Sequence, residues 1–291
     1  MSQKELGLAN NYRNQIFAIS LTKGRQKIDF TQWGAGEYKV TYDIKEAYGN
    51  NIIIYIPFLT FATLEKAMVF TKFCEKQKVY IQQTIIGYLS YGRQERETEK
   101  EPKLLDLLLS SVYNELYTPT IIEPHNLESV ENIFDGYYWT VPMYQKECKD
   151  FTVVSPDKGA EQRLGMFGVS SQIRVDKQRT TLGNVHSKIW YDRIQLMSER
   201  TDENAKEYKG TFVIYDDMCD GGRTFANVAE LVKERYPNAK IELYIAHAIL
   251  PYGVELLKGK IDKIVALDTC FPVGIYFDGF LEIRSAIDMF F

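Results

Sequence analysis

Short apolar runs alternate along the chain with segments in which apolar residues recur at helical spacing. The apolar runs are rich in Ile, Val and aromatic residues, and this composition predicts buried strands. The predicted strands are residues 16–19, 52–56, 79–86, 120–122, 151–154, 212–215, 241–249 and 264–267. The predicted helices are residues 62–74, 104–113, 163–167 and 225–236. Because strands and helices alternate, the sequence predicts an α/β fold with parallel sheets.

The same alternation runs through both halves of the chain, with similar numbers of strands and helices in each half. We therefore expect two tandem α/β domains, residues 1–145 and 146–274, although no sequence repeat is visible. One segment of the first half, residues 30–40, is instead rich in Gly, Gln and aromatic residues, which predicts a hairpin arm.

The segment that begins with the predicted strand 212–215 combines acidic and glycine residues in a way that predicts a ligand site. Asp216 and Asp217 follow the strand, and a glycine-containing turn, residues 220–224, leads into the predicted helix. Backbone N–H groups in such a turn and the positive end of the helix dipole both favour a bound anion. The two carboxylates repel phosphate, but they accept hydrogen bonds from sugar hydroxyl groups or bind a cation. A ribose that carries a phosphate fits both halves, whereas an ordinary strand, turn and helix is the alternative without a ligand.

The composition indicates a globular protein in which any phosphate site is a local feature. The chain has 291 residues, of which 45% are apolar and 25% are charged, and its formal net charge is −4. A negative net charge argues against a protein that binds nucleic acid or a membrane surface in general. We therefore expect neither nucleic acid nor a membrane as a partner.

The cysteines and the N-terminus predict the compartment of the protein. Cys74, Cys148, Cys219 and Cys270 are scattered without C-x-x-C spacing, which predicts reduced thiols and no zinc site. The N-terminus is polar, and the longest apolar stretch, residues 51–62, contains a proline and is too short to span a bilayer. These features together predict a cytoplasmic location.

Seven short segments resemble the motifs of one known family and occur in the same order. The segments are Gly36-Glu37, Tyr91-Gly92-Arg93-Gln94-Glu95-Arg96, Glu101-Pro102, Glu123-Pro124-His125, Thr152-Val153-Val154-Ser155-Pro156-Asp157-Lys158-Gly159, Asp176-Lys177-Gln178-Arg179 and the segment from Asp216 to Thr224. They resemble, respectively, the G-E of an adenine-contacting arm, Y-A-R-Q-D-[RK], E-P, D-L-H, V-S-P-D-x-G, a K-x-R catalytic loop and D-D-M-x-D-T-x-G-T. This set resembles the ribose-phosphate pyrophosphokinases, also called phosphoribosyl pyrophosphate synthetases. The last motif is shared with type I phosphoribosyltransferases, but the segments that contain Arg93-Gln94, His125, Ser155-Pro156-Asp157 and Lys177-Gln178-Arg179 are not.

The resemblance implies a fold and a reaction. The fold would be two tandem phosphoribosyltransferase-like, Rossmann-like domains with parallel sheets. Residues 1–145 would bind ATP, residues 146–274 would bind the ribose phosphate, and residues 275–291 would return to the N-terminal domain. The reaction would transfer the β,γ-diphosphate of ATP to the anomeric hydroxyl of ribose 5-phosphate, giving AMP and phosphoribosyl pyrophosphate. Magnesium would be the cofactor and ATP the co-substrate.

The resemblance also implies roles for individual residues. Lys177 and Arg179 would be catalytic, closing over the β,γ-phosphates from a polar, mobile loop. His125 and Asp157 would bind the metal. The residues implied in ATP binding are Glu37, Arg93, Gln94 and His125. Those implied in ribose-phosphate binding are Asp157, Asp216, Asp217, Asp220, Gly221, Gly222, Arg223 and Thr224. Glu37 would meet the adenine of a neighbouring subunit, which implies a homo-oligomer, either a dimer or a hexamer.

The phosphate turn departs from the family pattern at two positions. Gly221 stands where the family usually has Thr, and Arg223 stands where it has Gly. A wider and more cationic turn fits a 5-substituent larger than one phosphate, and the diphosphate of ADP-ribose is the simplest candidate. The product would then be ADP-ribose pyrophosphate, for NAD synthesis. Alternatively, Arg223 points to solvent and the glycines only shape the turn. Glu123, where the family has Asp, lengthens a carboxylate on the metal side.

Two other functions remain open on the sequence. A phosphoribosyltransferase would share the motif at 216–224 but would have no need for Arg93, Gln94, Lys177 and Arg179. A non-catalytic regulatory homologue would bind nucleotide without turnover. The presence of Lys177, Arg179 and the aspartates argues against this second alternative.

Overall fold

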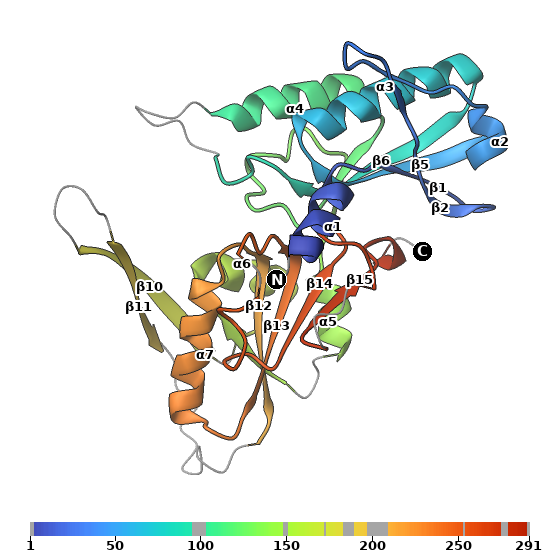
Figure 1. Cartoon of the computed structure of the whole chain (residues 1–291). Helices are drawn as coiled ribbons and strands as arrows, with labels where there is room; N and C mark the ends of the chain where they lie inside the picture. The colour runs from blue at the N-terminus through green and yellow to red at the C-terminus, as the bar shows by residue number, and fades with distance from the viewer. Residues whose placement is uncertain are drawn as a thin grey trace. The chain divides into compact units, whose positions relative to one another are not determined.

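The structure is a computed structural model, and the chain forms two compact units. The residues that the structure describes are 3–94, 103–147, 151–171, 173–182, 189–196, 209–252, 254–274 and 279–289. The N-terminal unit consists of Ser2–Trp139, Asp268–Pro272 and Ala286–Phe291. The C-terminal unit consists mainly of Thr140–Leu267 and Val273–Ser285. Figure 1 shows a sheet with flanking helices in each unit.

The N-terminal unit contains a six-stranded sheet in the order β2-β1-β5-β6-β7-β8. Its strands are β1 (Phe17–Ser20), β2 (Gly24–Lys27), β5 (Asn51–Leu59), β6 (Tyr80–Leu89), β7 (Pro119–Ile122) and β8 (Gly136–Tyr138). Strands β5 to β8 are parallel, whereas β1 pairs antiparallel with both β5 and β2. The helices are α1 (Gln3–Arg13), α2 (Ile44–Tyr48), α3 (Phe61–Gln77), α4 (Leu104–Glu115) and the 3-10 helix η2 (Ile287–Met289).

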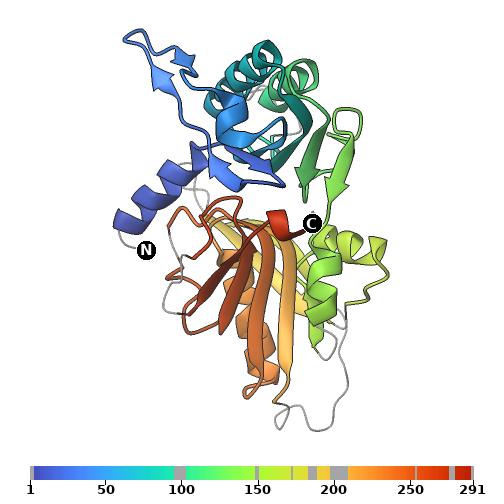
Figure 2. The ribbon, with the colours of Figure 1, turned by 90° about the vertical axis from the view of Figure 1, so that its right-hand side faces the viewer.

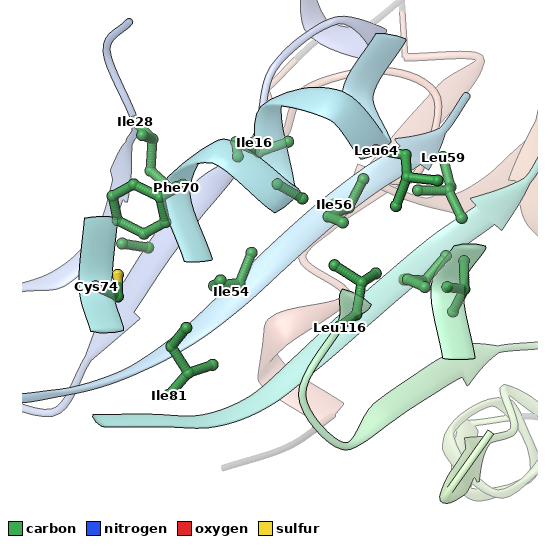
Figure 3. Close-up of a cluster of buried hydrophobic side chains, with 14 of the residues drawn as sticks. Ile16, Ile28, Ile54, Ile56, Leu59, Leu64, Phe70, Cys74, Ile81 and Leu116 are labelled. Carbon is green, nitrogen blue, oxygen red and sulfur yellow. The ribbon is translucent and has the colours of Figure 1, made fainter. Parts of the chain in front are cut away.

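The core of the N-terminal unit lies between its sheet and helices α3 and α4. Ile54 and Ile56 of β5 pack with Phe70 and Cys74 of α3, and all four are fully buried (Figure 3). Apolar residues of α3 recur at helical spacing and therefore face the sheet together. Strand β5 is buried on both faces over most of its length, as expected for a central parallel strand.

A small hairpin projects from the N-terminal unit. Strands β3 (Thr31–Gln32) and β4 (Tyr38–Lys39) pair antiparallel and enclose a short turn. The hairpin arm that the sequence predicts at residues 30–40 is therefore confirmed.

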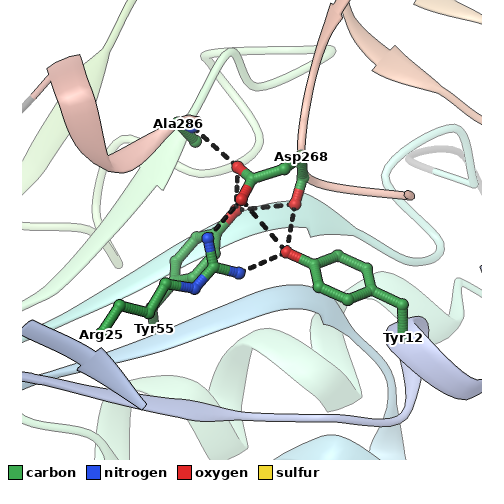
Figure 4. A network of polar contacts seen from close by, with 5 residues as sticks. All are labelled: Tyr12, Arg25, Tyr55, Asp268 and Ala286. Atoms are coloured by element: carbon green, nitrogen blue, oxygen red, sulfur yellow. Dashed lines mark hydrogen bonds and ion pairs between the residues drawn. The ribbon is translucent and has the colours of Figure 1, made fainter. Parts of the chain in front are cut away.

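One buried carboxylate joins distant segments of the N-terminal unit (Figure 4). Asp268 is fully buried and forms an ion pair with Arg25 of β2. The hydroxyl of Tyr12 donates to the Asp268 carbonyl oxygen at 2.8 Å, and the hydroxyl of Tyr55 donates to Oδ1 at 3.3 Å. The backbone N–H of Ala286 also donates to Oδ1, at 2.7 Å. Burial raises the pKa of both tyrosines, so their hydroxyl groups stay protonated as donors.

The C-terminal unit contains a seven-stranded sheet in the order β11-β10-β9-β12-β13-β14-β15. Its strands are β9 (Thr152–Ser155), β10 (Ile173–Leu182), β11 (Ile189–Leu196), β12 (Thr211–Cys219), β13 (Lys240–Ala248), β14 (Lys263–Leu267) and β15 (Leu281–Arg284). All neighbours are parallel except β10 and β11, which form an antiparallel ribbon. Figure 2 shows β12 to β15 side by side. The helices are α5 (Val141–Glu147), α6 (Lys158–Met166) and α7 (Arg223–Arg235).

Helices cover both faces of this sheet. On one face, Val213 and Tyr215 of β12 pack with Tyr144 of α5 in a buried cluster. On the other face, Phe212 of β12 meets Tyr236, which follows α7, with ring centroids 4.9 Å apart. Successive residues of a strand point to opposite faces of the sheet. Strand β12 therefore packs against other residues on both of its faces.

The predicted α/β fold with parallel sheets is confirmed, with two local corrections. Asp216 and Asp217 lie inside β12, whereas the sequence placed them after its end. Lys177 and Arg179 lie in strand β10 and not in a loop. The predicted domain boundaries stay a prediction. Parts of the predicted motifs, Glu95-Arg96 and Glu101-Pro102, lie outside the described residues, as does Cys148.

No helix among the described residues is both long and apolar enough to cross a membrane.

Candidate functional site

The candidate site of the C-terminal unit lies where two neighbouring parallel strands end. Asp157 follows β9, and Asp216 and Asp217 lie near the end of β12. Strands β9 and β12 pair in parallel, with Ile214 opposite Val154. Ligands of parallel α/β sheets bind beyond the carboxyl ends of the strands, so this edge is the expected position of a site.

A buried arginine joins the two adjacent aspartates. Nη2 of Arg163, on α6, lies 2.5 Å from Oδ1 of Asp216 and 2.8 Å from Oδ1 of Asp217. The exposed fractions are 9% for Arg163, 7% for Asp216 and 2% for Asp217. The backbone N–H of Asp217 also donates to Oδ1 of Asp216, at 2.9 Å. The two carboxylates and the guanidinium therefore form one compact charged group.

The environment of Asp216 opposes its ionisation. Burial and the neighbouring Asp217 raise the pKa of Asp216 well above its ordinary value, and Arg163 counteracts this increase. Two carboxylates this close do not ionise independently. The arginine is therefore the group that favours the charged form of the pair.

Asp157 has a structural contact of its own. Its side chain caps helix α6 by accepting a hydrogen bond from the backbone N–H of Ala160 at 3.0 Å. The hydroxyl of Ser155 donates to the Asp157 carbonyl oxygen at 2.7 Å. Asp157 is half-buried at the start of the helix that carries Arg163. One short helix thus positions both a candidate ligand residue and the arginine.

The turn after β12 leads directly into the N-terminus of helix α7. Gly222 has φ +76° and precedes Arg223, the first residue of α7. A glycine at this position has no side chain to cap the helix, which favours an anion at the backbone N–H groups of the first turn. Gly221 and Arg223 are exposed, whereas Thr224 is half-buried. Asp220, at the start of the turn, is exposed.

The two predicted catalytic residues lie on the β10–β11 ribbon. Lys177 is opposite Ile194, and Arg179 is opposite Asp192. The structure describes the backbone of this part of β10, and the side chains of both residues lie outside the described set. Since β10 pairs with β9, the ribbon extends from the same sheet that contains the aspartates.

The four predicted ATP-binding residues all belong to the N-terminal unit and are exposed. They are Glu37, Arg93, Gln94 and His125. Glu37 lies in the hairpin arm, where its carbonyl oxygen accepts a hydrogen bond from the N–H of Trp33 at 3.0 Å. Arg93 and Gln94 follow β6, and His125 follows β7, so the last three come after neighbouring parallel strands.

The segment before His125 has an unusual backbone. Glu123 is buried and has φ +43°, and Pro124 follows it. A residue before proline normally adopts an extended conformation, and a non-glycine residue rarely has positive φ. Such strain is typical of functional turns. The backbone N–H of Glu123 donates a hydrogen bond to the carbonyl oxygen of Tyr138 at 2.8 Å.

The described residues contain no group of three or more His, Cys, Asp or Glu side chains that could bind a metal ion together. The two predicted metal ligands, His125 and Asp157, belong to different units. A carboxylate such as Asp157 suits magnesium, which prefers oxygen ligands and usually keeps water and substrate phosphates in its coordination sphere. The chemistry of the Asp157 carboxylate by itself therefore suits a magnesium ion.

The comparisons with known proteins point to one family. No protein-family model matches the chain. A ribose-phosphate pyrophosphokinase from Mycoplasmopsis pulmonis is 25% identical over 202 residues, which are 64% of this chain and 58% of that protein. One from Hyphomonas neptunium is 26% identical over 204 residues, which are 65% of this chain and 61% of that protein. The chain is a relative of the ribose-phosphate pyrophosphokinases. It spans less than two thirds of the length of these relatives.

The fold agrees with this relationship. A crystal structure of phosphoribosylpyrophosphate synthetase from Mycobacterium smegmatis is similar to this chain with a TM-score of 0.62, and the match covers 90% of this chain and 87% of that one. The sequence identity is 17%, so the match shows the fold alone. The two-unit α/β architecture is thus that of a ribose-phosphate pyrophosphokinase relative.

Sequence reasoning missed Arg163. It lies in a segment that the sequence predicts only as a helix, and its partners are more than fifty residues away. One signal could have identified it. Two adjacent carboxylates in a buried strand need a nearby cation. Helix α6, which carries Arg163, directly follows β9, the strand that pairs with β12.

Proposed function

We propose that this chain is a diphosphokinase that transfers the β,γ-diphosphate of ATP to the anomeric hydroxyl of ribose 5-phosphate. The observation that supports this most is the Asp216–Asp217 pair, followed by a glycine turn at the start of α7. Carboxylates suit the hydroxyl groups of ribose, and a helix N-terminus suits its phosphate. The names of the relatives and the similar fold also support the proposal.

In the proposed reaction the anomeric oxygen forms a bond to the β-phosphorus of ATP. The bond from this phosphorus to the oxygen shared with the α-phosphorus breaks, AMP leaves with the electron pair, and the hydroxyl proton passes to solvent. Negative charge spreads over the phosphoryl oxygens in the transition state. Lys177 and Arg179 of β10 are the residues proposed to stabilise this charge, because positioned cations are the main catalytic device in such transfers.

Each unit has a proposed substrate. In the C-terminal unit, Asp216 and Asp217 would accept hydrogen bonds from the ribose hydroxyl groups, and residues 220–224 would bind the 5-phosphate. In the N-terminal unit, Arg93 and Gln94 would bind ATP, the arginine as a forked donor to phosphate. Asp157 is the proposed magnesium ligand of the C-terminal unit and His125 that of the N-terminal unit, and bound magnesium would neutralise charge on the nucleotide phosphates.

The proposal includes a homo-oligomer in the cytoplasm. Glu37 lies exposed on the hairpin arm, a position from which it could reach a neighbouring subunit. Cys74, Cys219 and Cys270 are free and buried, which fits a reducing compartment.

A second acceptor, ADP-ribose, is favoured by the shape of the phosphate turn. A Cβ atom added to Gly221 would meet no heavy atom within 4 Å, so the turn has open space at this position. Arg223 is exposed beside it and could pair with a second phosphate. The chemistry at the anomeric hydroxyl would be the same.

AMP release from ATP and magnesium tests the proposal, with ribose 5-phosphate in one reaction and ADP-ribose in another. AMP with ribose 5-phosphate supports the leading proposal, and AMP mainly with ADP-ribose supports the second. Nucleotide binding without AMP in either reaction would contradict both and would favour a regulatory homologue.

A further inference from the structure

The contact between Arg163 and the aspartates has a feature that an ordinary ion pair lacks. A single atom, Nη2, contacts Oδ1 of Asp216 and Oδ1 of Asp217 at once. Successive residues of a strand point to opposite faces of the sheet, so two neighbouring aspartates would normally diverge. The shared guanidinium therefore holds the two carboxylate oxygens toward one point.

The arrangement also brings the two carboxyl groups close together. The contacts of Asp216 with Arg163 and with the backbone N–H of Asp217 are both made by its Oδ1 atom. The side chains of Asp216 and Asp217 also interact with each other. Two carboxylates oriented in this way match a pair of adjacent hydroxyl groups on one sugar ring.

The positive charge of Arg163 also favours the ionised form of the two carboxyl groups. Arg163 contacts both buried carboxylates, and taking a cation away from such a pair favours the uptake of a proton. Burial and Asp217 already raise the pKa of Asp216, against the effect of Arg163. A protonated carboxyl group would offer a donor where the hydroxyl groups of ribose need an acceptor.

We propose that Arg163 is a positioning residue that holds Asp216 and Asp217 in the geometry for two ribose hydroxyl groups, and so determines affinity for the ribose-phosphate substrate rather than for ATP. This inference rests on the proposed function of the same site. A purely structural role for the ion pair would instead predict a loss of stability without selectivity between the two substrates.

The test compares Arg163→Gln and Arg163→Lys with the wild-type chain, measuring kcat and the KM for each substrate by AMP release. Arg163→Gln should raise the KM for ribose 5-phosphate by about 10- to 100-fold, as expected for losing hydrogen bonds to charged groups, and change the KM for ATP by less than about twofold. Arg163→Lys should give an intermediate increase of about three- to tenfold, because lysine keeps the charge but lacks the planar fork.

Lys240→Gln is the matched control. Lys240 forms an ion pair with the buried Glu242 at 2.6 Å, at the opposite end of the same sheet, where β13 begins next to the start of β12. Its removal disturbs a partly buried ion pair of the same unit, so the melting temperature can fall. Both KM values should stay at the wild-type level.

The outcomes separate the two proposals. If the wild-type chain makes AMP and Arg163→Gln leaves the ratio of the two KM values unchanged, the positioning role is wrong while the proposed function stands. If Arg163→Gln does not fold, Arg163→Lys decides, and an equal change in both KM values overturns the role. A wild-type chain that makes no AMP with either acceptor overturns the proposed function and, with it, this inference.

Discussion

The backbone N–H of Ala286 donates a hydrogen bond to Oδ1 of Asp268 at 2.7 Å. Asp268 begins one late segment of the N-terminal unit, and Ala286 begins another. Residues 273–285, between these segments, belong to the C-terminal unit and include β15. Asp268 and Ala286 therefore flank residues 273–285, and the hydrogen bond between them joins the two segments of the N-terminal unit at this point. The same carboxylate forms the ion pair with Arg25.

We expect Asp268→Asn to destabilise the N-terminal unit. The substitution keeps the shape of the side chain but leaves Arg25, whose side chain is 21% exposed, without its counter-charge. The expected loss is about 2–4 kcal/mol, somewhat below the usual value for a broken buried pair because Arg25 is partly solvated. Urea unfolding followed by circular dichroism measures it.

Asp29→Asn is the control for this prediction. Asp29 pairs with Lys27 at 3.4 Å on the surface, and both side chains are largely exposed. The expected change is below about 0.5 kcal/mol. Equal effects of the two substitutions would show that the Asp268 network contributes no more than a surface pair.

We expect Lys177→Ala to lower kcat by about 100- to 1,000-fold without a change in melting temperature. The reason is the loss of a positive charge near the transferring phosphoryl group, where positioned charges contribute most to the rate. The residue lies on strand β10, which pairs with β11 in an antiparallel ribbon. Lys258→Ala removes a surface lysine that pairs with Glu255 at 3.3 Å, and it should leave kcat unchanged. A wild-type rate for Lys177→Ala would remove this residue from the mechanism.

We expect Gly222→Ala to destabilise the turn before α7. The backbone has φ +76°, and an added Cβ would lie 3.2 Å from Cδ2 of Leu257. Positive φ disfavours alanine and the contact is tight, so the expected loss is about 1–3 kcal/mol of unfolding free energy. Gly221→Ala, for which no heavy atom lies within 4 Å, is the stability control. A smaller effect at Gly222 than at Gly221 would contradict the turn geometry.

The buried thiols predict a dependence of reactivity and stability on pH. Burial raises the pKa of Cys74 to about 12 and that of Cys270 to about 11, and it also raises that of Cys219. Since only the thiolate is alkylated, native protein with Cys148→Ser should react with iodoacetamide at pH 8 at least about 100-fold more slowly than the same protein in urea. Rapid labelling of the native variant would show that these thiols are accessible.

The sign of the stability effect follows from the same shifts. The thiol pKa is raised on folding, from about 8.5 in the unfolded chain, so the folded state binds more protons above that pH. The contribution to stability is complete below about pH 8.5 and decreases as the pH rises toward the folded value. The free energy of unfolding should therefore be lower at pH 10 than at pH 8. A higher value at pH 10 would contradict the burial of these thiols.

Local patterns predicted most of the strands and helices because each buried element has its own apolar period. The strand beginning at residue 212 was predicted too short, because Asp216 and Asp217 are polar and their ion pairs with the distant Arg163, which compensate their burial, are not visible in the local sequence. The ribbon of β10 and β11 was predicted as a loop at Lys177 and Arg179. The polar residues of β10 form a strand through pairing with β11, where Ile194 lies opposite Lys177, and the local composition around Lys177 does not reveal this pairing.

The residues of the candidate site were predicted one by one from motifs, and their roles stay predictions. The turn at residues 220–224 and the cap at Asp157 are short-range features that the sequence can specify. The contacts of Arg163 and Asp268 are long-range, and each depends on a single residue whose partners are far away in the chain. No local period identifies such a residue.

A phosphorus NMR spectrum of the chain incubated with ATP, magnesium and ribose 5-phosphate tests the proposed reaction most directly. We expect the loss of ATP with equal formation of AMP and of a sugar that carries a diphosphate on its anomeric carbon. This product pattern identifies transfer of the whole β,γ-diphosphate in one step. ADP and inorganic phosphate as the products, or unchanged ATP, would contradict the central claim.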